Sequence, residues 1–284
     1  MYLPLAAIVT LVICGLCRWI GRQILIFGAV AAAGLAVLTG VRNRDYRTGL
    51  SIWQDTVAQR PDNARALNDL ALELAKLPGQ SSEAIARYQA ALRLEPDYAE
   101  AHNNLAISLD NAGEPAQAIE QYRQALKFRP LYPQALEGMA VALGRSGHPA
   151  EAVEKFEAAL RMKPDYADAH YNFAADLEQI PGRIPQAIQE YKAALQIEPN
   201  YAEAHYNLAN ALAGIPGGLP EAIAQYQEAL RLKPGYAEAQ NNLAVAYANS
   251  GRIDLAIQHF QLALKLDANF AGARENLEKL QGIK

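Results

Sequence analysis

The stretch DYAEAHNNLA at residues 97–106 occurs three more times in the chain with few changes. The other copies are DYADAHYNFA at 165–174, NYAEAHYNLA at 200–209 and GYAEAQNNLA at 235–244. A proline recurs at the same interval, at Pro61, Pro96, Pro130, Pro164, Pro199 and Pro234. Self-similarity at a fixed period of about 35 residues indicates a repeat architecture, in which each unit is one supersecondary element.

Two amphipathic helices are predicted between successive prolines. Residues 99–111 and 115–128 both carry apolar or alanine positions at i, i+3, i+4 and i+7, which is helical periodicity. Glycine separates the two helices and predicts a turn there. The turn glycines are Gly79, Gly113, Gly147, Gly182, Gly217 and Gly251.

Small and large side chains alternate in the second helix of each unit. The large residues are Tyr88, Tyr122, Phe156, Tyr191, Tyr226 and Phe260. The alanines four positions before them are Ala84, Ala118, Ala152, Ala187, Ala222 and Ala256. Large against small predicts an interdigitating helical core, in which the tyrosines pack instead of forming a stacking platform. Asp97, Asp165 and Asn200 are predicted N-caps of the first helices.

These units resemble tetratricopeptide repeats. The family pattern is carried by His102, Leu105, Ala106, Leu109, Gly113, Ala118, Tyr122, Ala125 and Pro130. The resemblance implies an all-α superhelical solenoid of helix–turn–helix repeats. Its six repeats are expected at 62–96, 97–130, 131–164, 165–199, 200–234 and 235–268. A linker and a lone repeat helix occupy 43–61, and a capping helix occupies 269–284.

Residues 1–42 are predicted to form a two-helix transmembrane hairpin. Two charge-free runs, at about 1–17 and 24–41, approach the length that spans a bilayer. Trp19 and its flanking arginines suit the membrane interface. A cleaved signal peptide and a buried soluble hairpin are the competing interpretations. The hairpin predicts a lipid partner and an integral protein of a bacterial inner membrane, with the repeats on the non-cytoplasmic side.

Charge and motif content exclude several classes of function. Residues 1–47 hold five arginines and one aspartate, which leaves the remainder with 21 basic and 29 acidic residues. An acidic body without a basic stripe argues against a nucleic-acid partner. His102, His170 and His205 recur at a core-facing place, so packing is expected there instead of metal binding. No nucleophile–base pair, phosphate loop or metal motif is present, which predicts a chain without cofactor or metal that is not an enzyme.

One polar place on the first helix is the candidate binding site. It lies on the face opposite the core, which in the tetratricopeptide family lines the groove that binds extended peptides. Its occupants are Asp69, Asn104, Asn172, Asn207, Asn242 and Asn276, with Gly138 in the third repeat. Asparagine is a poor residue inside a helix, so its recurrence needs a cause.

Two causes stay open for these asparagines. The series is similar to the asparagine ladder in the repeat domain of the O-linked N-acetylglucosamine transferase, which implies binding to a peptide backbone. Alternatively, each asparagine bonds the neighbouring repeat or is inherited by duplication. Glu100, Asp168, Glu203 and Glu238 lie on the same face and predict a groove that favours basic or neutral ligands.

A second resemblance concerns the start of the chain. MYLPLA at 1–6 and RNRDYRTGLSIWQDTVAQRPDNARALNDLA at 42–71 resemble the C-terminal region of transmembrane and tetratricopeptide repeat-containing mannosyltransferase-like proteins. The predicted function is a membrane-anchored scaffold that binds proteins or peptides through its concave groove. The alternatives are an acceptor-recruiting arm of a membrane glycosyltransferase, whose catalytic part is absent from this chain, and a structural scaffold that acts through its convex face.

Overall fold

A computed structural model describes residues 8–10, 12–14, 32–37 and 48–282. Every regular element in these residues is a helix. The chain divides into two compact units, residues 1–96 and 97–284.

The first unit contains α3 (Gly49–Gln59), α4 (Ala64–Ala75) and α5 (Ser81–Leu94). Thr48 caps α3 through a reciprocal capping box with Ser51, which satisfies two backbone donors at the helix start. Asn63 caps α4, since its Oδ1 accepts from the backbone nitrogen of Ala66 at 3.0 Å. The helix α4 packs against both α3 and α5.

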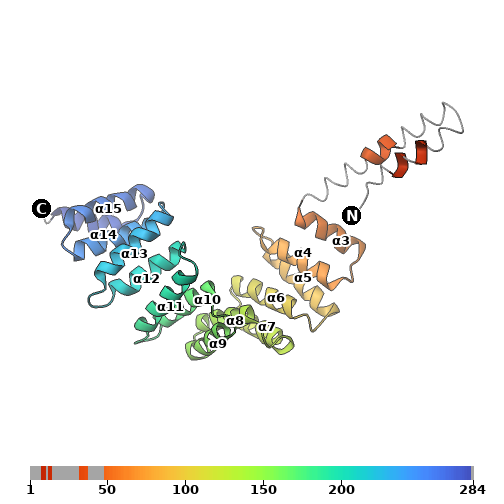
Figure 1. Cartoon of the computed structure of the whole chain (residues 1–284), viewed down its shortest axis with the longest axis horizontal. Helices are drawn as coiled ribbons and strands as arrows, with labels where there is room; N and C mark the ends of the chain where they lie inside the picture. The colour runs from red at the N-terminus through yellow and green to blue at the C-terminus, as the bar shows by residue number, and fades with distance from the viewer. Residues whose placement is uncertain (1–7, 11, 15–31, 38–47, 283–284) are drawn as a thin grey trace. The chain divides into compact units, whose positions relative to one another are not determined.

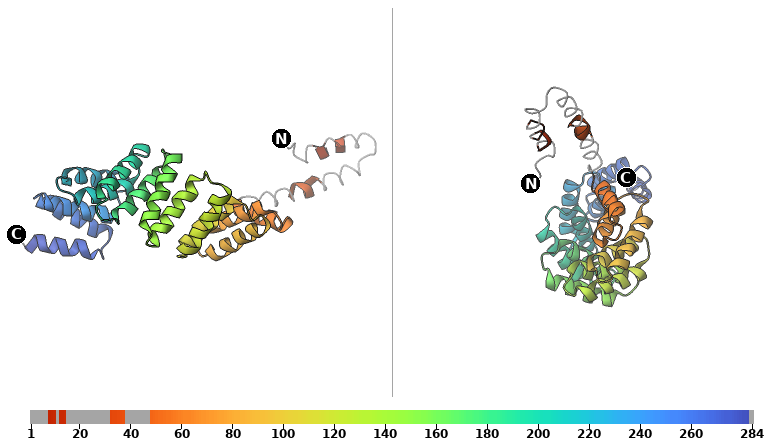
Figure 2. Two further views of the ribbon diagram at one scale, coloured as in Figure 1. Left: turned by 90° about the horizontal axis from the view of Figure 1, so that it is seen from below. Right: turned by 90° about the vertical axis from the view of Figure 1, so that its right-hand side faces the viewer.

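The second unit is a run of helices that pack in chain order (Figures 1 and 2). They are α6 (Ala99–Asn111), α7 (Pro115–Phe128), α8 (Pro133–Arg145), α9 (Pro149–Met162), α10 (Ala167–Glu178), α11 (Ile184–Ile197), α12 (Ala202–Ala213), α13 (Leu219–Leu232), α14 (Ala237–Asn249), α15 (Ile253–Leu266) and α16 (Ala271–Gly282). The even-numbered helices are the first helices of the pairs, and the odd-numbered helices from α7 on are the second helices.

First helices also contact one another across successive pairs. The helix α8 contacts α6 and α10, and α12 contacts α10 and α14, whereas no two second helices in the described residues contact each other to this extent. A stack whose first helices lie closer together than its second helices is concave on the first-helix side. We call this side of residues 97–282 the first-helix face.

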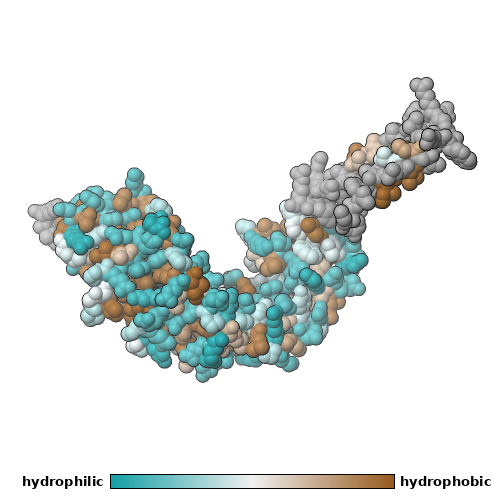
Figure 3. Space-filling view, in the orientation of Figure 1, coloured by the Kyte–Doolittle hydropathy of each residue, from teal (hydrophilic) through white to brown (hydrophobic). Residues whose placement is uncertain are grey.

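The core confirms the predicted alternation of large and small residues. All six alanines predicted in the second helices are fully buried, and the six aromatic residues that follow them are at most 3% exposed. Packing of this density removes both groups from water and fixes the distance between helices. The outer surface of the second unit is mostly hydrophilic, with scattered hydrophobic residues (Figure 3).

The predicted turn glycines are confirmed. All six have φ between 76° and 81°, and no other described residue has a positive φ. An L side chain is strained in this region of the backbone, so glycine is required for the tight turn between the two helices of a pair.

The predicted N-caps of the first helices are wrong. The helices α6, α10 and α12 begin after a tyrosine, and no side chain caps their first turns. These N-cap tyrosines are Tyr98, Tyr166 and Tyr201.

The prediction of an integral membrane protein is corrected by the helices of the described residues. None of these helices combines the length and the apolar character that crossing a bilayer requires. Most of the predicted hairpin at 1–42 lies outside the described residues, which within it form helix at 8–10, 12–14 and 32–37. A bilayer span needs about 20 apolar residues in one helix, and the hydropathy of the sequence alone could not establish that helix.

Candidate functional site

The predicted site residues are divided between the two units. Asp69 lies on α4 of the first unit, and the others lie on first helices of the second unit. Each of the six is half-buried. The places in the second unit are Asn104 on α6, Asn172 on α10, Asn207 on α12, Asn242 on α14 and Asn276 on α16.

Three of the asparagines link successive first helices. Each donates a hydrogen bond from Nδ2 to a residue on the preceding first helix. On that helix, the acceptor stands one position before the residue that is equivalent to the asparagine. The bonds join Asn172 to Glu137 Oε1 at 2.6 Å, Asn207 to the Tyr171 hydroxyl at 3.0 Å and Asn242 to the Tyr206 hydroxyl at 3.1 Å. The amide donors therefore hold neighbouring pairs together, as one of the two alternatives for these asparagines predicts.

The ends of the series make local contacts. Asn104 Oδ1 accepts from Asn103 Nδ2 at 3.4 Å on the same helix. Asp69 accepts from Asn68 at 3.0 Å and forms an ion pair with Arg65 at 3.8 Å.

Gly138 interrupts the series, and a core tyrosine fills the space beside it. A Cβ built on Gly138 would lie 2.4 Å from the hydroxyl oxygen of Tyr122 and 2.6 Å from its Cζ. Tyr122 is 2% exposed, so its ring has little room to move away. The core tyrosine of α7 thus occupies the space that an asparagine side chain needs on α8.

Two of the four acids at the start of the first helices, Glu100 and Glu203, have cationic partners. Glu100 Oε1 accepts from Arg129 at 2.8 Å, and Glu203 Oε1 accepts from Lys233 at 2.9 Å. Arg129 and Lys233 each follow the second helix of the same pair. Each also lies over the ring of the next tyrosine, Arg129 at 4.6 Å from the Tyr132 centroid and Lys233 at 4.5 Å from the Tyr236 centroid. The predicted acidic groove is therefore weaker than the sequence suggested, because these carboxylates already have cationic partners.

Several tyrosines stack on the first-helix side, contrary to the prediction that tyrosines serve only the core. The rings of Tyr171 and Tyr201 lie 4.8 Å apart and stacked, and those of Tyr206 and Tyr236 lie 4.7 Å apart and tilted. All four residues are half-buried. Aromatic pairs at this separation add about 0.5–1.5 kcal/mol beyond the area they bury. The tyrosines join the start of one pair to the first helix of the preceding pair.

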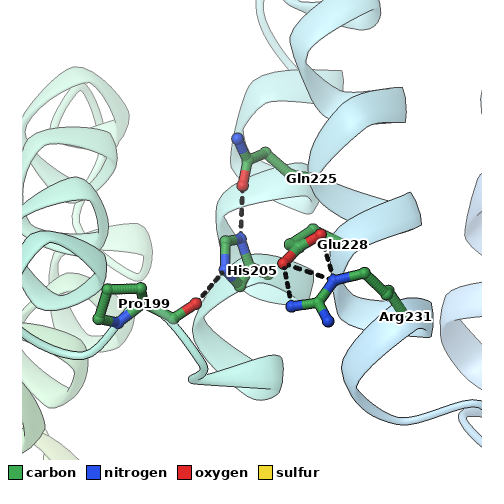
Figure 4. A network of polar contacts seen from close by, with 5 residues as sticks. All are labelled: Pro199, His205, Gln225, Glu228 and Arg231. Atoms are coloured by element: carbon green, nitrogen blue, oxygen red, sulfur yellow. Dashed lines mark hydrogen bonds and ion pairs between the residues drawn. The ribbon is translucent and has the colours of Figure 1, made fainter.

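The recurring histidines join the two helices of a pair. His205 Nε2 lies 3.0 Å from the carbonyl oxygen of Pro199, and Nδ1 lies 2.6 Å from Gln225 Oε1 (Figure 4). His170 has an equivalent arrangement with Pro164 and with Glu190, whose carboxylate lies 2.7 Å from Nδ1. The hydrogen bond to Glu190 raises the pKa of His170 above its usual value. These contacts give the predicted packing histidines a structural role.

The first-helix face contains two cavities in the second unit. The larger, of about 450 Å³, is lined by Asn103, Ile107, Tyr132, Glu137, Gly138 and Tyr166, among others, and we call it the Gly138 cavity. The smaller, of about 250 Å³, is lined by Asn210, Asn242, Val245 and Asn249, among others. Both cavities lie between successive pairs, where extended ligands of a solenoid are expected to bind.

Glu137 is a site residue that sequence reasoning missed. It accepts the Asn172 amide and a hydrogen bond from Tyr166, while burial raises the pKa of its carboxyl. The structurally equivalent places on α10 and α12 carry Tyr171 and Tyr206. The only clue in the sequence was that the third repeat replaces the usual pair of residues with glutamate and glycine, which looked like a loss of regularity.

Family models match most of the described chain. A model of the TPR repeat matches residues 78–113, 181–214 and 217–251. Models of the tetratricopeptide repeat match residues 99–132, 137–175 and 237–270. No curated protein sequence matches the chain.

Solved structures have the same fold at low sequence identity. YrrB, described as a TPR protein with an unusual peptide-binding site, is 24% identical, with 67% of this chain and 97% of YrrB covered and a TM-score of 0.56. MamA from Desulfovibrio magneticus RS-1 is 24% identical over 61% of this chain and 97% of its own, with a TM-score of 0.55. The APC/C hetero-tetramer Cut9–Hcn1 is 19% identical over 86% of this chain and 48% of the matched chain, with a TM-score of 0.70.

These matches concern the repeats. They do not show the resemblance to mannosyltransferase-like proteins that the start of the chain suggested. The glycine turns, the buried alanines and the helix pairs agree with the matched models. The described part of the chain is therefore an all-helical solenoid of tetratricopeptide repeats.

Proposed function

We propose that the chain is a scaffold that binds a protein or an extended peptide along the first-helix face of residues 97–282. The observation that carries the proposal is the pair of cavities on this face, both lined by polar side chains of successive first helices. Cavities of a few hundred Å³ with a few placed polar groups are typical of ligand sites. The peptide-binding site described for YrrB, which has the same fold, supports a ligand of this class.

The asparagines contribute to this proposal through their oxygens. Their Nδ2 groups bond the preceding helix, which fixes the orientation of each amide. No described residue donates a hydrogen bond to Oδ1 of Asn172 or Asn207, and both side chains are half-buried. An amide oxygen held in this way accepts a backbone N–H of a ligand without a further loss of side-chain entropy.

The structural contacts limit the predicted set of binding residues. We propose that Asn172, Asn207 and Asn242 line one continuous binding track. The track lies within the six predicted repeats at 62–268, which are followed by the predicted capping helix. Gly138 carries no side chain on α8, so the proposed uninterrupted track of asparagines runs from α10 to α14. The role as an arm of a membrane glycosyltransferase is supported by no observation and is not carried further.

A matched pair of variants tests the ladder. A library of random 12-residue peptides displayed on phage is selected on the full chain, and the best peptide is measured by fluorescence anisotropy. Asn207→Ala and Tyr171→Phe both remove the hydrogen bond between Asn207 Nδ2 and the Tyr171 hydroxyl, so each should lower stability by about 0.5–1.5 kcal/mol, and Asn207→Ala by more because its amide also bonds Tyr191. Only Asn207→Ala also removes the amide, and we expect it alone to weaken binding, by about tenfold.

The results separate the two alternatives for the asparagines. Equal losses of binding in both variants would show that the asparagine is purely structural. A library that yields no peptide enriched above selection on the empty support would contradict the scaffold proposal itself.

A further inference from the structure

We propose that the Gly138 cavity is a specificity pocket for one cationic side chain, lysine or arginine, of the bound segment. This inference rests on the proposed function and deepens it, because it names the chemical class that one position of the ligand must have. Three observations support it. Glu137 has no cationic partner among the described residues, aromatic groups line the same cavity, and an amide oxygen in the lining has no hydrogen-bond partner.

Glu137 has hydrogen-bond donors but no cationic partner among the described residues. Its Oε1 accepts from Asn172, and Tyr166 supplies a second hydrogen bond, so both known partners are neutral. The side chain is half-buried, and Asp168 adds a second negative charge nearby, which raises the pKa of Glu137 further. A carboxylate held out of water without a counter-ion is costly, and a cation that enters the cavity relieves that cost.

The cations already near the cavity are engaged elsewhere. Arg129, which is part of the lining, forms an ion pair with Glu100 at 2.8 Å and lies over the ring of Tyr132. Lys163 lies over the ring of Tyr166, with Nζ 4.4 Å from the centroid. Neither base is among the ion-pair partners of Glu137, so the charge of Glu137 remains available to a ligand.

The rest of the lining suits a long cationic side chain. Ile107 is 45% exposed and gives an apolar wall against which the methylene stem packs. Tyr132 and Tyr166 complete the wall with aromatic rings that already carry the cations of Arg129 and Lys163, so the carboxylate of Glu137 is the group that attracts a further cation. The cavity volume of about 450 Å³ is ample for one such side chain and small for a folded element.

Asn103 adds an unused acceptor to this lining. Its side chain is 4% exposed, and its Oδ1 is buried without a hydrogen-bond partner in the described residues. Buried polar groups are nearly always paired in native proteins, so an orphan at a cavity is a reason to expect a donor there. Lysine and arginine carry several donors and no acceptor, which matches a lining that offers a carboxylate and an amide oxygen.

The test uses the peptides selected on the full chain. We expect the enriched sequences to share lysine or arginine at one position. Replacing that residue with the neutral isostere citrulline, or with norleucine for lysine, should weaken binding about tenfold or more. Glu137→Gln should weaken binding of the parent peptide to a similar extent. It should also remove the difference in affinity between the cationic and the neutral peptide.

Two controls separate binding from folding. Glu137→Gln keeps the Oε1 acceptor for Asn172, so circular dichroism and the melting temperature should show a folded chain of at least parental stability. Glu154→Gln removes one exposed acid from the second helix α9, outside the cavity lining, and should leave the preference for the cationic peptide intact.

The possible results distinguish failure of the pocket proposal from failure of the scaffold proposal. Enriched peptides without a shared basic position, or a Glu137→Gln variant that keeps the full preference for the cationic peptide, would overturn the pocket and leave the scaffold standing. If no peptide is enriched, the scaffold proposal fails and the pocket fails with it.

Discussion

Gly138 is the one position of the asparagine series, among the second-unit repeats, that has no side chain. Its missing side chain is usually a cost in a helix, where alanine is better by about 1 kcal/mol. Here the cost is offset because Tyr122 lies where a Cβ would be. The glycine that interrupts the asparagine series therefore lies against a core ring of α7, and Glu137 lies next to it in the lining of a cavity.

Gly138→Ala should destabilise the protein despite the gain in helix propensity. The new methyl group must displace a ring that is buried in the core, and overpacking costs about 1–3 kcal/mol. We expect a net loss of about 1 kcal/mol in the free energy of unfolding by urea. Gly235→Ala is the control, since no atom lies within 4 Å of its Cβ position and its φ is not positive. A Gly138→Ala chain as stable as this control would show that Tyr122 moves freely.

The element scale is governed by bonds between the two helices of one pair. His170 has an acceptor at each ring nitrogen, the carboxylate of Glu190 and the carbonyl of Pro164, so both nitrogens must donate. His205 faces Gln225 instead, whose amide can turn to match a neutral ring. Among the described pairs, α10–α11 is thus the one in which a carboxylate faces the histidine and raises its pKa.

Glu190→Gln should remove a pH-dependent part of the stability. The pKa of His170 is raised in the folded state above the unfolded value of about 6.5, so its stabilising contribution is fully present below that pH. The contribution is lost as the pH rises through the folded pKa. We expect wild type to exceed Glu190→Gln by about 1 kcal/mol at pH 5.5, with the difference shrinking by pH 8.5. Urea titrations at several pH values measure it, and a difference that grows with pH would contradict this assignment.

Sequence pattern predicted the elements better than the site, and particular residues show why. The turn glycines and buried alanines were found because each is required by the backbone or core of every repeat. The caps were missed because tyrosine, not aspartate, directly precedes the first helices α6, α10 and α12, and Tyr201 packs across repeats. Glu137 was missed because its role depends on Asn172 and Tyr166 of the next pair, a partnership that no spacing within one repeat reveals.

At the scale of the second unit, each helix depends only on its neighbours in the stack. The helices pack in chain order, and contacts beyond the next pair are absent from the main contacts of the described residues. Stability in such a structure is approximately a sum of local terms and interfaces between neighbours. The consequence for function is that a defect in the middle separates parts of the binding face, while a defect at the end shortens it.

Phe156→Ala and Phe260→Ala test this consequence with the same substitution in equivalent places. Both rings are almost fully buried in a second helix, so each variant should lose about 3–5 kcal/mol locally. Phe156 lies in α9 and stacks on Phe173 of α10 at 5.1 Å, so its loss weakens the interface between two central pairs. Hydrogen exchange followed by mass spectrometry should then show faster exchange on both sides of α9. Phe260→Ala should speed exchange mainly in α14 to α16 and leave α6 to α11 protected. A uniform increase across α6 to α16 in both variants would instead mean that residues 97–282 unfold as a single unit, in which case substitutions at either cavity would affect binding at the other.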